Sequence, residues 1–83
     1  MKTLTISLPD TVFSAVRWDP AEFVREMRIE AATQWYAQHR VSQEKAAEIA
    51  GLDRAAFIDA LASRRISVAQ VEMDELVDEA RRD

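Results

Sequence analysis

The sequence predicts a mainly α-helical protein that begins with a β-strand and ends with a short strand and an acidic helix. Three observations indicate this fold class. Residues 2–8 alternate apolar and polar side chains, residues 20–39 repeat apolar side chains at helical spacing, and residues 42–65 have the spacing of a helix-turn-helix. We expect residues 1–65 to form one domain and residues 66–83 to form a tail.

The N-terminal stretch KTLTISL, residues 2–8, is typical of a half-buried strand because it alternates and is rich in β-branched residues. Pro9 ends it, since proline cannot donate to a β-ladder. A strand needs a partner, which is either residues 65–71 or the same strand of a second copy. Pairing across a two-fold axis is the economical solution and predicts a homodimer. The apolar residues that would hold this dimer are Leu4, Ile6 and Leu8.

Two helices are expected next. Asp10 is expected to cap a short helix that ends near Val16, and Asp19 to cap a longer one that ends near His39, with Pro20 at its first position. The longer helix has an apolar stripe formed by Phe23, Val24, Met27, Ala31 and Trp35. The aromatic side chains Trp18, Trp35 and Tyr36 are interpreted as core residues rather than as a ligand-stacking site.

Residues 42–65 predict two short helices joined by a tight turn. Ser42 and Asp53 suit helix N-caps, and Gly51 suits the left-handed residue that ends the first helix. The small Ala47 stands where two helices would cross, with Phe57 following in the second helix. This is the spacing of a helix-turn-helix, although an ordinary pair of antiparallel helices fits the same pattern.

The charges are unevenly distributed along the chain. Residues 37–65 carry five basic and four acidic side chains, whereas residues 66–83 carry two basic and six acidic ones. If the helix-turn-helix binds DNA, its basic and amide side chains should make the contacts. These candidates are Arg40, Gln43, Lys45, Arg54, Arg64 and Arg65. Asp53 and Asp59 would repel the phosphates, so DNA binding and a hairpin that does not touch DNA both remain open.

The tail is expected to be a short extended segment followed by an acidic amphipathic helix. Such a helix either docks on its own domain or binds in the groove of a partner. The candidate partner-binding residues are Met73, Leu76, Val77, Ala80, Arg81 and Arg82.

No pattern in the chain points to catalysis, a cofactor or a metal. His39 is the only histidine, cysteine is absent, and a single glycine excludes a glycine-rich phosphate loop. The lack of cysteine suits the cytoplasm, and no apolar run is long enough for a transmembrane helix. We therefore expect a cytoplasmic protein that is not an enzyme.

Three segments follow one another along nearly the whole chain: TLTISLPD, AEFVREMRIEAATQWYAQHR and VSQEKAAEIAGLDRAAFIDALASRRI. In this order they resemble the small prokaryotic proteins of uncharacterised protein family 175. The most specific part is KAAEIAGLDRAAFIDAL followed by RRISV. One departure is Arg65-Ile66-Ser67-Val68, where relatives often have a sequence like Gly-Ile-Pro-Val before the last strand.

The resemblance implies an antitoxin that is encoded beside a PIN-domain ribonuclease toxin, neutralises it and represses its own operon. It also implies a cluster of metal-binding carboxylates in the toxin, with which Arg81 or Arg82 could pair. The alternative is a protein-interaction adaptor whose helical hairpin does not bind DNA.

Overall fold

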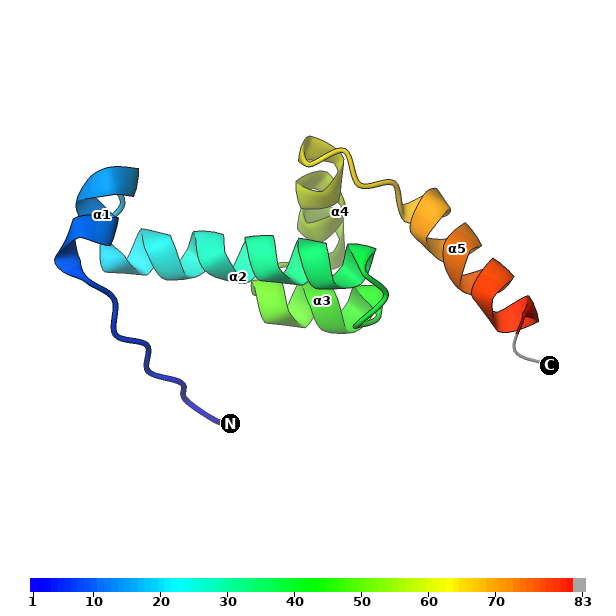
Figure 1. Ribbon diagram of the computed structural model, residues 1–83, viewed down its shortest axis with the longest axis horizontal. Helices are drawn as coiled ribbons and strands as arrows, with labels where there is room; N and C mark the ends of the chain where they lie inside the picture. Colours follow the sequence, from blue (N-terminus) through cyan, green and yellow to red (C-terminus); the bar gives the residue numbers. More distant parts are fainter. Residues whose placement is uncertain (82–83) are drawn as a thin grey trace.

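The computed structural model describes residues 1–81, and its regular secondary structure is entirely helical over that range. Helix α2 forms the long axis of the molecule (Figure 1). Helix α1 lies at its N-terminal end, α3 runs beside its C-terminal half, α4 stands across them, and α5 extends away at the far end. The bounds are α1 Asp10–Val16, α2 Pro20–Ala37, α3 Gln43–Ala50, α4 Arg54–Ser63 and α5 Val68–Ala80.

Both predicted β-strands are wrong, because neither appears among residues 1–81. Residues 1–9 have no regular structure and are all exposed, since one strand alone leaves its backbone groups unpaired. The second predicted strand, residues 65–71, is instead a short connection followed by the first turn of α5, which begins at Val68. The Ser67 hydroxyl accepts a hydrogen bond from the amide of Gln70 at 3.2 Å, and this N-cap begins a helix in spite of the β-branched residues beside it.

Side-chain caps set the starts of three other helices as predicted. Asp19, Ser42 and Asp53 each accept a hydrogen bond from the amide three residues later, at 2.8, 3.1 and 2.7 Å. Helix α1 differs, because its N-cap is Pro9 and Asp10 is already its first helical residue. Side-chain capping therefore sets the starts of α2, α3, α4 and α5.

The core lies where the C-terminal half of α2 meets α3, α4 and the start of α5. Phe57 and Leu61 of α4 are fully buried, and Tyr36 of α2 packs edge-on against Phe57 with the ring centroids 6.1 Å apart. Val71 of α5 is also buried. The small buried residues that let α2 and α3 approach closely are Ala32, Ala46, Ala47 and Ala50.

The N-terminal part of the chain has an aromatic cluster but no buried residue. The ring of Phe23 lies 5.3 Å from that of Phe13 and 6.1 Å from that of Trp18. No residue before Ala32 is buried. The predicted core role is confirmed for Tyr36 but is wrong for Trp35, which is 41% exposed.

Candidate functional site

The turn between α3 and α4 has the predicted geometry. Gly51 adopts a left-handed conformation with φ of 70° and ψ of 30°, and its amide bonds back to the last turn of α3. Leu52 then packs partly buried against the core. The prediction that Gly51 ends the first helix of the pair is confirmed.

Arg28 of α2 closes the end of α3, a role that the sequence did not reveal. Its Nε donates to the carbonyl oxygen of Ile49 at 2.8 Å and its Nη2 to that of Glu48 at 3.3 Å. These are carbonyls that a helix end leaves without partners. The sequence shows only that Arg28 is an arginine on the preceding long helix. No local pattern links it to Glu48 and Ile49, which lie about twenty positions later.

Helix α4 presents a nearly neutral surface to solvent. Arg54 is exposed at its start and Asp59 is exposed further along, while Ile58 is 37% exposed between them. Such a surface is unusual for a DNA-reading helix, whose phosphate contacts come mainly from cations. Arg54 is the one basic side chain that α4 itself directs to solvent.

The predicted DNA-binding cations fall into two groups. Arg64 is bound to Glu30 of α2, with Nε and Nη2 at 2.7 and 2.6 Å from the carboxylate Oε1. Lys45 pairs with Glu48 at 3.0 Å, and this contact raises the pKa of Lys45. The candidates that are exposed and form no ion pair with another described residue are Arg40, Arg54 and Arg65.

A hollow lies between the start of α3 and the start of α4, and it brings two predicted residues together. Gln43 and Arg54 both line it, together with Ser42, Glu44 and Leu52. The Gln43 amide nitrogen is buried and has no hydrogen-bond partner among the described residues. Gln43 therefore points into the domain in this state, whereas Arg54 remains available to a ligand.

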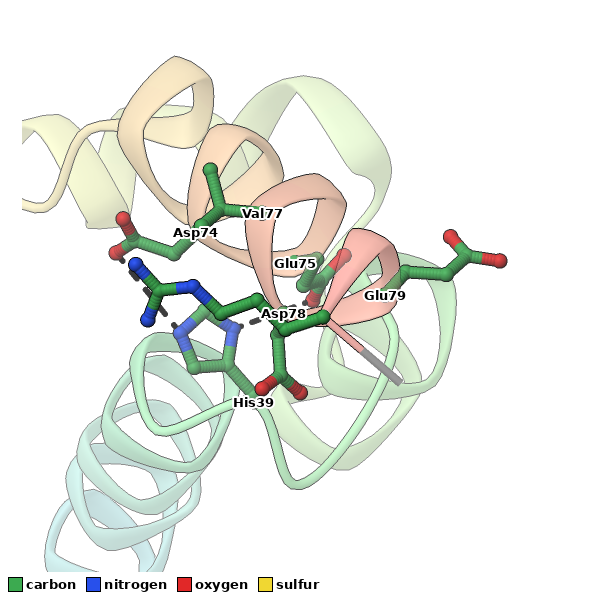
Figure 2. A pocket seen from close by; sticks show the side chains of 7 residues that line it. His39, Asp74, Glu75, Val77, Asp78 and Glu79 are labelled. Carbon is green, nitrogen blue, oxygen red and sulfur yellow. Dashed lines mark hydrogen bonds and ion pairs between the residues drawn. The ribbon is translucent and has the colours of Figure 1, made fainter. Parts of the chain in front are cut away.

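Helix α5 docks against the end of α2 through polar contacts of His39 (Figure 2). His39, which follows α2 with a positive φ of 63°, faces two carboxylates of α5. Its Nδ1 lies 3.5 Å from Oε1 of Glu75 and its Nε2 lies 3.9 Å from Oδ2 of Asp74. These contacts hold one edge of α5 near the domain.

Tyr36 of α2 lies close to Glu72 and Glu75 of α5. Its hydroxyl oxygen is buried and has no hydrogen-bond partner among the described residues. Burial raises the pKa of Tyr36, and the negative charges of Glu72 and Glu75 raise it further. Together with the buried Val71, this places one side of the first turns of α5 against the folded domain.

The apolar stripe of α5 faces solvent. Met73 is 56% exposed, Leu76 62% and Val77 42%, and Ala80 and Arg81 are exposed as well. Arg82 lies outside the described residues. The predicted partner-binding residues that are described thus share an open surface, and the acidic residues beside it are Glu72, Asp74, Glu75, Asp78 and Glu79.

The predicted dimerisation residues are also open to solvent. Leu4 is 86% exposed, Ile6 60% and Leu8 36%. They lie on the unstructured N-terminal segment that leads away from α1 (Figure 1). In the single chain, this segment is not packed into the core.

The profile of the uncharacterised protein family UPF0175 matches residues 1–82. No curated protein and no solved structure matches the chain. Within residues 1–81, no helix has the length and apolar character needed to cross a membrane. The same residues contain no group of three or more His, Cys, Asp or Glu side chains that could hold a metal ion.

Proposed function

Because the chain belongs to the uncharacterised protein family UPF0175, we propose that it is a cytoplasmic antitoxin that neutralises a PIN-domain ribonuclease and represses its own operon. In this proposal α5 binds the toxin, and α3 and α4 form the DNA-binding unit. The PIN-domain partner rests on the resemblance described above. The observation that carries the proposal is the solvent-facing apolar stripe of α5 among carboxylates.

The chemistry of α5 suits a nuclease partner. Met73, Leu76 and Val77 form a row one to two turns long that no described residue covers. Exposed apolar rows of this kind mark protein-binding surfaces, and a helix presenting one fits an apolar groove. The flanking carboxylates would then meet the basic surface with which a ribonuclease binds RNA, which favours rapid association and correct orientation.

We expect the double variant Leu76→Ser/Val77→Ser to lose toxin binding. Each apolar side chain contributes about 1.5 kcal/mol when buried, so removal of both should weaken binding about 100-fold. Titration calorimetry with the toxin and an RNA-cleavage assay would measure this loss. The variant should stay folded, since both side chains are exposed.

Ile58→Ser is the matched control, because it replaces an exposed apolar residue on α4 and should leave neutralisation unchanged. Deletion of the whole tail is a poorer test. Val71 is buried, and Ile66 and Val68 pack against the core, so a cut after Arg65 would damage the domain itself. Full neutralisation by the Leu76→Ser/Val77→Ser protein would show that α5 is not the inhibitory element.

DNA binding is expected to depend on Arg54. The first residues of the second helix in a helix-turn-helix reach base edges or phosphates, and Arg54 is exposed there. Arg54→Ala should weaken binding to DNA from the chain's own promoter about tenfold or more. If Arg54 binds a phosphate, the slope of log affinity against log salt should become shallower by about 0.9 for each phosphate that the variant no longer neutralises. Fluorescence anisotropy at several salt concentrations gives both values.

Arg25→Ala removes the same charge from an exposed position on α2 and serves as the control. Equal effects of the two substitutions would contradict a specific role for Arg54. Arg64→Ala is not a suitable probe, because Arg64 joins α4 to α2 through Glu30.

The second candidate function is an adaptor that binds protein and does not bind DNA. Two observations favour it: Asp53 and Asp59 are exposed on or beside α4, and Arg64 is already neutralised by Glu30. Toxin neutralisation without measurable promoter binding at low salt would support the adaptor. Promoter binding that requires Arg54 would exclude it.

A further inference from the structure

The single chain exposes more surface than a folded monomer of its mass. Its accessible surface is 6711 Å², whereas a compact protein of 9.5 kDa exposes about 5,000 Å². Its radius of gyration is 15.2 Å, against about 12 Å for a compact chain of this length. The extended residues 1–9, which are all exposed, contribute to this excess of about 1,700 Å², which is larger than one standard interface half of about 800 Å².

Two helices supply apolar faces that no described residue buries. One is the stripe of α5. The other, here called the α2 face, consists of Val24, Met27, Ala31 and Trp35. By the geometry of an α-helix these four side chains lie within an arc of about 80°. Val24 is 49% exposed, Met27 36% and Trp35 41%, although a helix of this amphipathic kind ordinarily buries such a stripe.

The margins of the α2 face carry fewer charges than those of the α5 stripe. Gln34 and Gln38 lie beside it and are exposed. Two neighbouring charges on α2 already have partners, since Arg28 donates to carbonyls of α3 and Glu30 pairs with Arg64. A two-fold contact of this face with itself therefore brings few like charges together. A two-fold contact through α5 would instead place its carboxylates next to the same carboxylates of the second copy, where they would repel each other.

We infer that the α2 face binds a second copy of this chain, forming an isologous homodimer. The contact buries the exposed Val24, Met27 and Trp35, and the first two of these lie in a part of the chain that has no buried residue of its own. It leaves α5 open on both copies. This inference is independent of the proposed function, because it concerns self-association alone.

Disulfide trapping tests the inference directly, since the chain contains no cysteine. Single cysteines at Val24, Met27, Ala31 and Trp35 should form covalent dimers under mild oxidation. The yield should be highest at the position nearest the two-fold axis, where Cα atoms come within about 7 Å. Leu76→Cys on α5, which is more exposed, should cross-link several-fold less. Equal or stronger cross-linking at Leu76 would overturn the inference.

Sedimentation equilibrium of a charge variant gives the second test. Met27→Glu should raise the dimer dissociation constant at least about 100-fold, because it would bury a carboxylate at the contact. Leu76→Glu is the matched control and should leave the dimer dissociation constant unchanged. Circular dichroism checks that both variants are folded.

A wild-type chain that stays monomeric at about 0.1 mM protein, above the dissociation constant of a standard interface, would overturn the inference. So would a dimer that survives Met27→Glu but dissociates in Leu4→Ser/Ile6→Ser, because the N-terminal segment would then be the interface.

Discussion

Phe57→Ala is expected to remove a large part of the protein's stability. Phe57 is fully buried and is among the largest side chains of the core. Truncation of a buried phenylalanine to alanine costs about 3–5 kcal/mol. An 83-residue chain has a total stability of only about 4–12 kcal/mol, so the variant would lose about a quarter of it or more. Urea unfolding followed by circular dichroism would measure the loss.

The position of Phe57 explains why the loss should be cooperative. Its ring packs against Tyr36 of α2, so α4 and α2 would separate together. Phe57→Leu keeps an apolar side chain and should cost much less. A midpoint in urea that is the same for Phe57→Ala and the parent protein would contradict this account of the core.

Gly51→Val is expected to lower the free energy of unfolding by about 3 kcal/mol or more. Two effects contribute. A β-branched residue is strained at the φ of 70° that Gly51 adopts, at about 1–3 kcal/mol. A Cβ there would also lie only 3.1 Å from the guanidinium of Arg28, which would have to shift and so weaken its hydrogen bonds to the carbonyls of Glu48 and Ile49. Thermal and urea melts would measure the sum.

A double-mutant cycle separates the two effects. In an Arg28→Ala background, Gly51→Val should cost only the backbone strain, because the guanidinium is no longer there to be displaced. Gly51→Asn tolerates the left-handed conformation better and should be the milder substitution. An unchanged cost of Gly51→Val in the Arg28→Ala background would show that the two residues are not coupled.

The parts of the fold that depend on neighbouring residues are predictable from sequence. Ser42, Asp53 and Gly51 act within one turn of the chain, so their residue types alone indicate where α3 and α4 begin and end. The same holds for Asp19 and the start of α2. The two helices and the turn of residues 42–65 therefore follow from local sequence.

The features that depend on distant residues are not predictable in this way. Alternation in residues 2–8 indicates a preference for a strand, but a strand forms only with a partner. In residues 65–71 the β-branched pattern competes with the Ser67 cap, and the cap determines the structure. The sequence suggests Arg64 as a DNA contact because nothing in the local sequence reveals Glu30, which binds it from another helix.

The thirteen residues of α5 are under two different kinds of selection. Its first turns are tied to the fold through Val71, so mutations there are filtered by folding, whatever the partner. Met73, Leu76 and Val77 face solvent, so under the proposed function mutations there are selected by the partner. In that proposal, a lineage can change its partner by changing these three side chains while the core residues stay the same.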